Sequence, residues 1–276
     1  MRAVPRAVRV VVLGLSLLLA ACAQQKEPPL EEQPVEVIYQ KAESLLAREK
    51  FSDAAKMFEE VERLYPYSDL ARRALVMSAW AHHKAREYEE ARAAAQRFLD
   101  FYPADEDAPW AQYIIALSYY DQIARVGRDK GVTLKALEAL RTVMERYPDS
   151  DYARSARLKF DVALDQLAAK EMEVGRYYLR HQHYGAAINR FRVVVEDFPT
   201  STQTPEALYR LVEAYLSLGL TDEAQTAGAI LGYNFRGTDW YRDAHRLLTG
   251  RGLAPEAKGD SWLRVIWRRT VRGEWI

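Results

Sequence analysis

Small and aromatic residues recur along this chain at fixed distances from a repeated dipeptide, an aromatic residue followed by proline. Alanine stands twelve residues before each of these prolines and again eight residues after it. An aromatic residue stands fifteen residues before three of them, and Thr133 takes that place before Pro148. A register this constant indicates an internal repeat. The four dipeptides are Tyr65-Pro66, Tyr102-Pro103, Tyr147-Pro148 and Phe198-Pro199.

Each repeat predicts a pair of helices. The chain has few of the alternating apolar and polar runs that are typical of strands. Proline ends the second helix of a pair, because its ring clashes with the preceding turn and its nitrogen has no proton to donate. Ser68, Asp149 and Thr200 follow three of the prolines and are predicted to cap the helices that come next. We therefore expect an all-α helical repeat of about five helix pairs, with its body at residues 34–249.

The register resembles that of tetratricopeptide repeats, in which a proline closes the second helix and small residues let neighbouring helices approach. Two of the intervals between prolines are stretched, to 45 and 51 residues. The first insertion falls near 121–133, a charged segment with two glycines, and predicts a loop. The second has no helix breaker between residues 151 and 175, and predicts a helix lengthened by several turns.

The front of the chain has the three parts of a secretory signal. Three arginines precede an apolar run at 10–19, which is about half the roughly 20 residues that a membrane-spanning helix needs. Residues 19–22, Leu-Ala-Ala-Cys, resemble the lipobox of bacterial lipoproteins, and Cys22 is the only cysteine of the chain. The resemblance implies cleavage after residue 21 and lipid on Cys22, with 22–33 as a polar tether. The alternative is an ordinary signal peptide with an incidental cysteine.

Charge and cysteine content narrow the possible partners. Residues 1–21 contain three arginines and no acidic residue, so their removal takes the net charge from zero to minus three. That balance does not predict nucleic-acid binding, which favours a strongly basic face. A single cysteine leaves no disulfide to brace the body.

The sequence does not predict an enzyme. It has no nucleophile elbow, phosphate-binding loop or dinucleotide fingerprint. His82 and His83 are adjacent, and His181 and His183 are two apart, so neither pair has the four-residue spacing of two ligands on one helix face. We interpret all four as solvated helix residues, and we expect neither a metal nor a cofactor.

A tetratricopeptide-like repeat predicts instead a peptide-binding groove on the first helix of each pair. Exposed aromatic side chains beside a few charges suit that role, because they offer a large contact area at low entropic cost. The alternative is that these aromatics pack between repeats. The expected groove positions are Tyr39, Glu43, Arg73, Val76, Trp80, Trp110, Tyr113 and Tyr120.

Three longer stretches resemble the BamD family of outer-membrane assembly lipoproteins. They are "RLYPYSDLARRA" with its echo "ERYPDSDYARSA", "LAAKEMEVGRYYLRHQHYGAAINRF" at 167–191, and "LGYNFRGTDWYRDAHRLL" at 231–248. The resemblance implies a non-enzymatic, lipid-anchored subunit on the periplasmic face of the outer membrane. The early repeats would bind unfolded outer membrane proteins, and the last repeats would dock on the barrel subunit BamA beside other lipoproteins of the complex. Arg190 matches the family's Asn-Arg pair on the docking side.

Residues 250–276 lie beyond the matched stretches and are rich in arginine and tryptophan. They predict a short basic amphipathic helix that lies on a membrane or on a partner, or else a frayed tail. Two other functions stay open at this stage. One is a periplasmic tetratricopeptide scaffold for cell-wall or division machinery, and the other is a lipid-anchored enzyme.

Overall fold

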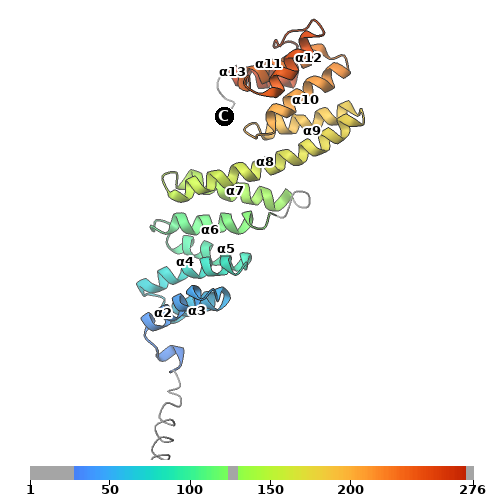
Figure 1. The fold of residues 1–276 in the computed structure, drawn as a ribbon. Helices are drawn as coiled ribbons and strands as arrows, with labels where there is room; N and C mark the ends of the chain where they lie inside the picture. The colour runs from blue at the N-terminus through green and yellow to red at the C-terminus, as the bar shows by residue number, and fades with distance from the viewer. Residues whose placement is uncertain (1–27, 124–129, 272–276) are drawn as a thin grey trace, which may run out of the picture. The chain divides into compact units, whose positions relative to one another are not determined.

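The computed structural model describes residues 28–123 and 130–271. Within these ranges the chain forms twelve α-helices and one 3-10 turn, with no strand, which confirms the all-α, tetratricopeptide-like prediction (Figure 1). The elements are η1 (Leu30–Glu32), α2 (Val35–Ala47), α3 (Phe51–Leu64), α4 (Asp69–Lys84), α5 (Tyr88–Phe101), α6 (Ala108–Tyr120), α7 (Lys130–Arg146), α8 (Asp151–Arg180), α9 (Tyr184–Asp197), α10 (Thr204–Ser217), α11 (Thr221–Asn234), α12 (Asp239–Thr249) and α13 (Trp262–Val271).

The chain divides into two compact units, residues 1–78 and 79–276. In the first unit α2 packs against α3 around Phe58, which is fully buried. Tyr39 meets the Phe58 ring edge-on, with ring centroids 5.4 Å apart. The Tyr65 hydroxyl donates to the carbonyl of Gln33, which fastens the segment before α2 to the end of α3.

The alanines of the repeat register are all fully buried between helices. All eight have no exposed surface, because a larger side chain would hold neighbouring helices apart. They are Ala54, Ala91, Ala136 and Ala187 before the prolines, and Ala74, Ala111, Ala156 and Ala207 after them. The predicted register is therefore confirmed as the register of helix packing.

The prolines end helices as predicted, but the caps differ. Each of α3, α5, α7 and α9 ends two residues before its proline. Ser68 accepts a hydrogen bond from the backbone of Leu70, as expected. The prediction was wrong for the other two caps. Ser150, not Asp149, caps α8 through its hydroxyl, and α10 begins at Thr204, too far along the chain for Thr200 to cap it.

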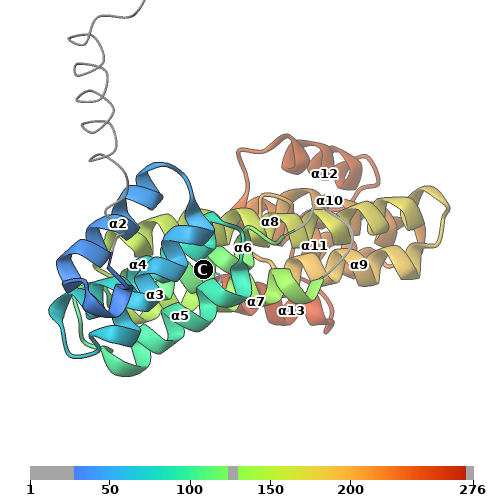
Figure 2. The ribbon, with the colours of Figure 1, turned by 90° about the horizontal axis from the view of Figure 1, so that it is seen from below.

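The lengthened helix is confirmed as α8, which has 30 residues. Its first half packs against α7, and its second half packs against α9, so α8 passes from one helix pair to the next (Figures 1 and 2). Gly175 allows the close approach of α9, because a Cβ there would lie 2.5 Å from the Phe191 ring. Of the loop predicted near 121–133, residues 124–129 lie outside the described residues, and residues 130–133 belong to α7, so that part of the prediction was wrong.

The C-terminal segment corrects both interpretations of the tail. Residues 262–271 form the predicted helix, α13, but its apolar face packs on α11 instead of facing a membrane. Leu263 and Ile266 are buried in the core that α9, α10 and α11 also build. The Trp262 indole donates to the Tyr215 hydroxyl at 3.0 Å. In its described part the tail is therefore an integral layer of the fold.

Candidate functional site

Five half-buried aromatic residues gather on the last turns of α4, on α6 and at the start of α8. The rings of Trp80 and Trp110 are 6.0 Å apart, and those of Tyr113 and Tyr152 are 5.4 Å apart. Tyr120 lies further along α6, where the ammonium of Lys159 sits 5.3 Å from its ring. We call Trp80, Trp110, Tyr113, Tyr120 and Tyr152 the aromatic surface.

His83 is buried and packs against the aromatic surface through the Trp80 ring. Its ring stacks on Trp80 at a centroid distance of 5.5 Å, and its two nitrogens lie 3.3 Å from Ser118 Oγ and from Asp121 Oδ2. Burial lowers the pKa of His83 more than the Asp121 carboxylate raises it, so the neutral ring predominates at pH 7. The interpretation of His83 as a solvated residue was wrong.

His82 is buried as well, and its Nδ1 lies 2.7 Å from Glu87 Oε2. His181 and His183 are exposed, as predicted. No group of three or more His, Cys, Asp or Glu side chains in the described part of the chain is arranged to hold a metal ion.

The tyrosines of the aromatic surface are uncharged hydrogen-bond donors, and lysines lie at its edges. Burial raises the pKa of Tyr113, Tyr120 and Tyr152, so all three hydroxyls keep their protons at neutral pH. Lys84 lies 5.5 Å from the Trp80 ring, which adds a positive charge at one edge. The surface can therefore combine aromatic contact with hydrogen bonds to a polar backbone.

The groove positions in the first unit divide into exposed and buried residues. Glu43 on α2 and Arg73 on α4 are exposed. Tyr39 is only 7% exposed and Val76 only 1%, so neither is accessible to a substrate. These two predictions are corrected: both side chains are core residues, since Tyr39 packs on Phe58 and Val76 lies among buried alanines of α4.

Sequence reasoning missed Tyr152 as part of the site, whereas His83 had been placed one turn along the groove from Trp80. Tyr152 lies near the start of α8, outside the repeat positions used for the prediction, and only its contact with Tyr113 reveals it. His83 was considered as a metal ligand and set aside for its spacing. The sequence signal for ring stacking is that His83 lies within five residues of both Trp80 and Tyr88, and its ring contacts both.

Arg190, the predicted docking residue, lies on α9 with its side chain about half exposed. Its guanidinium donates to Glu171 Oε2 at 3.0 Å, and Lys130 at the start of α7 pairs with the other carboxylate oxygen. Glu171 itself is only 3% exposed. Burial raises the pKa of Glu171, but the hydrogen bonds and charges of Lys130 and Arg190 outweigh it and lower the pKa overall. Arg190 therefore ties α9 to α8, whatever else it binds.

A second network of charged residues joins α8 to α10 and α12. Arg176 of α8 makes two hydrogen bonds to the carboxylate of Glu206, at 2.8 and 2.7 Å, and Arg210 joins Glu206 to Glu213. The Tyr209 and Trp240 rings flank Arg210 at 5.2 and 5.6 Å. Burial, with the neighbouring Glu213, raises the pKa of Tyr209 to about 12. These contacts join α8, α10 and α12.

Cys22 and the signal at 1–21 lie outside the described residues. In the part of the chain that the structure describes, none of the helices is both long enough and apolar enough to cross a membrane.

Comparison with known proteins shows the family. The profile of the family YfiO, described as outer membrane lipoprotein, matches residues 31–230. A protein of Caulobacter vibrioides named outer membrane protein assembly factor BamD is 47% identical over 252 residues, which cover 90% of this chain and 83% of that protein. A Rickettsia prowazekii protein of the same name is 36% identical, over 86% of this chain and 94% of its own length. A third, from Xylella fastidiosa, is 28% identical over 84% of this chain and 83% of its own.

The matched stretch runs from the 3-10 turn before α2 almost to the end of α11, so it includes all the residues of the aromatic surface and the ion pair of Arg190. The chain belongs to the YfiO family of outer membrane lipoproteins, the family of the BamD assembly factors.

Proposed function

We propose that this chain is a non-enzymatic subunit of the complex that assembles β-barrel proteins in the outer membrane. The observation that carries the proposal is its match along nearly the whole chain to proteins named outer membrane protein assembly factor. The names of these relatives refer to protein assembly. The half-buried aromatic residues on α4, α6 and α8 form a surface suited to binding a polypeptide rather than to catalysing a reaction on it. No catalytic residue and no cofactor is assigned.

The aromatic surface would receive unfolded outer membrane proteins. Strands of such proteins alternate apolar and polar residues, so one face of an extended segment is apolar while its backbone still lacks hydrogen-bond partners. Trp80 and Trp110 would contact the apolar face, and the protonated hydroxyls of Tyr113 and Tyr152 would donate to backbone carbonyls. Exposed Glu43 and Arg73 are retained as candidate contacts in the first unit.

Docking on a barrel subunit of the BamA kind, and on other lipoproteins of the complex, would use the later helices. Arg190 is the candidate contact there, since about half of its side chain remains accessible while Glu171 orients its guanidinium. At the front of the chain, lipid on Cys22 would hold the protein on the periplasmic face of the outer membrane. Several acyl chains on one residue satisfy the requirement for at least two membrane signals.

The binding of a labelled barrel segment tests the substrate proposal. The probe is a fluorescent peptide of about ten residues taken from a transmembrane β-strand, mixed with the detergent-solubilised full chain. Trp80→Ala and Trp110→Ala should each weaken binding by roughly tenfold, because central aromatic residues dominate such contacts. Tyr67→Ala, which removes a fully exposed ring outside the aromatic surface, is the matched control. Equal affinities in all three variants and the parent would remove the aromatic surface from the proposal.

The partners are tested separately by purifying the chain from detergent-solubilised membranes. Recovery of a large β-barrel protein is the expected result. Recovery of cell-wall enzymes without a barrel protein would favour the scaffold function instead.

A further inference from the structure

The first half of α8 exposes apolar side chains at positions that the other repeats cover. The residue ten places after each repeat proline is Val76, Tyr113, Leu158 and Tyr209 in turn. Val76 is buried, Tyr113 packs against Tyr152 of α8, and Tyr209 packs against Trp240 of α12. Leu158, by contrast, is 70% exposed, and one turn further Val162 is 47% exposed.

The length of α8 explains why these positions are uncovered. The next helix pair does not pack over the first half of α8 but is displaced along it, where Met172 and Gly175 meet α9. The connection between α9 and α10 reaches α8 at Asp165, whose carboxylate accepts hydrogen bonds from the backbone and hydroxyl of Thr202, both at 2.8 Å. Figure 1 shows α9 and α10 over one end of α8, and the other end without a helix above it.

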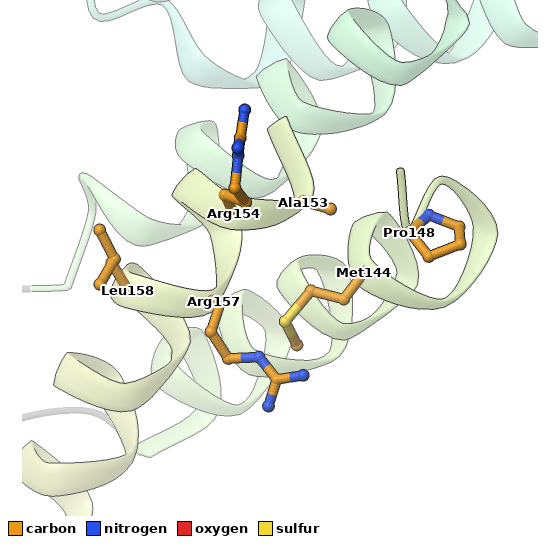
Figure 3. A pocket seen from close by; sticks show the side chains of 6 residues that line it. All are labelled: Met144, Pro148, Ala153, Arg154, Arg157 and Leu158. Atoms are coloured by element: carbon orange, nitrogen blue, oxygen red, sulfur yellow. The ribbon is translucent and has the colours of Figure 1, made fainter. Parts of the chain in front are cut away.

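A shallow cavity opens beside Leu158, between the end of α7 and the start of α8. Its volume is about 390 Å³, and Figure 3 shows Met144 of α7 and Arg157 of α8 among its walls. The lining comprises Met144, Pro148, Ala153, Arg154, Arg157 and Leu158. Two of these six residues are arginines and none is acidic. Arg154 is paired with Asp151, whereas Arg157 forms no ion pair with any described residue.

We propose that this uncovered face of α8 docks an amphipathic helix of a partner protein, which takes the place of the missing cover. The partner helix would insert an apolar side chain between Met144 and Leu158 and present an Asp or Glu to Arg157 about one turn away, a spacing of three or four residues. A shallow cavity of this kind can accept the apolar side chains of one amphipathic helix.

Charge gives the docked helix a direction. Arg154 and Arg157 lie on the first two turns of α8, and the exposed Asp161 lies one turn further on the same face. Because Arg154 is paired with Asp151, an acidic residue of the partner is attracted to Arg157 and repelled near Asp161. This surface is separate from the aromatic surface and from Arg190, and the inference does not depend on either of them.

Site-directed photocrosslinking in intact membranes tests the inference. Benzoylphenylalanine replaces Leu158 or, separately, Val162 in the full chain, and the crosslinked peptide is sequenced by mass spectrometry. The control position is Leu218, whose exposed fraction of 47% matches that of Val162 but which lies at the end of α10. The expected product joins both test positions, and not the control, to one segment with helical periodicity that has an Asp or Glu within four residues of an apolar anchor.

The chemistry of the contact is then tested by charge reversal. Arg157→Glu in the same chain should lower the crosslinking yield by roughly tenfold, and replacing the partner's acidic residue by lysine should restore it. Arg268→Glu, on the exposed face of α13, should leave the yield unchanged. A crosslink to a second copy of this chain, to a segment without an acidic residue, or to nothing at both test positions would overturn the proposal. A yield that Arg157→Glu does not change would do the same.

Discussion

The two halves of α8 differ in what they expose and what they bury: apolar side chains are exposed on the first half, and a carboxylate is buried on the second. The first half exposes Leu158 and Val162 to solvent, whereas the second half buries the carboxylate of Glu171 beside Met172. The helix is continuous, so its own periodicity does not account for the difference. The neighbours do: α9 covers the second half and supplies Arg190 as a counter-charge, and no helix of the described chain covers the outer face of the first. Whether a side chain of α8 is exposed therefore depends on which helix packs against it, and not on its residue type.

The largest effect is expected from truncating the core of the second half. Met172→Ala should lower the free energy of unfolding by about 2–5 kcal/mol, because Met172 is fully buried in the cluster shared by α8, α9 and α10. Denaturation of the purified chain measures this change. A loss below about 0.5 kcal/mol would mean that the second half of α8 is as loosely covered as the first.

Removing the buried charge should have the next largest effect. Glu171→Gln keeps the shape but leaves Lys130 and Arg190 without their carboxylate, and should cost about 1–3 kcal/mol. The two cations remain half exposed, which moderates the loss. Arg242→Gln is the control, because it removes an exposed pair with Asp239 on α12 and should cost no more than about 0.5 kcal/mol.

The ion pairs of Glu171 make the free energy of unfolding depend on pH. Since the folded state lowers the pKa of Glu171, the ionised carboxylate stabilises the fold above the ordinary glutamate pKa. That contribution disappears as the pH falls through the lowered pKa. The difference in stability between the parent chain and Glu171→Gln should therefore be full at pH 7 and shrink progressively in acid below about pH 4. A difference that stays constant with pH would show that packing, not charge, is lost in the variant.

Two glycines sharpen the comparison between covered and open helix surface. Gly175→Ala should lower the free energy of unfolding by about 1 kcal/mol or more, because the added Cβ would meet the buried Phe191 ring at 2.5 Å. In Gly185→Ala the added Cβ meets nothing within 4 Å, and the variant should raise it by up to about 0.5 kcal/mol, less than in a helix interior because Gly185 is the second residue of α9. Thermal melting of the two variants side by side checks both signs. Stabilisation by both substitutions would contradict the close approach of α8 and α9.

The smallest effect is expected at the exposed half. Leu158→Ala should change the free energy of unfolding of the isolated chain by no more than about 0.5 kcal/mol, since little of the side chain is buried. The measurement pairs with Met172→Ala under identical conditions. A loss above about 2 kcal/mol would show that the first half is covered in solution and would remove the free surface on which its docking role depends.

The aromatic groove illustrates the limits of predicting a site from repeat register. Register alone treated Val76 and Tyr113 as equivalent ligand-facing positions, yet one is core and the other is half exposed. Arg190 was predicted from family resemblance alone. Its pairing with Glu171 was not visible, because the eighteen residues between them include the turn between α8 and α9, whose geometry the sequence does not state.

By itself the sequence determined the helix pairs, their alanine contacts, their proline ends and the extra length of α8. These features follow from the local spacing of apolar residues, from proline as a helix terminator and from alanine as a small residue at helix contacts, so they can be predicted from the sequence. Only the tertiary structure decided which faces are covered. It placed α13 on α11, put Tyr39 in the core and left Leu158 uncovered. Burial is a property of what packs from elsewhere in the chain, and the displacement of α9 and α10 along α8 has no local signature.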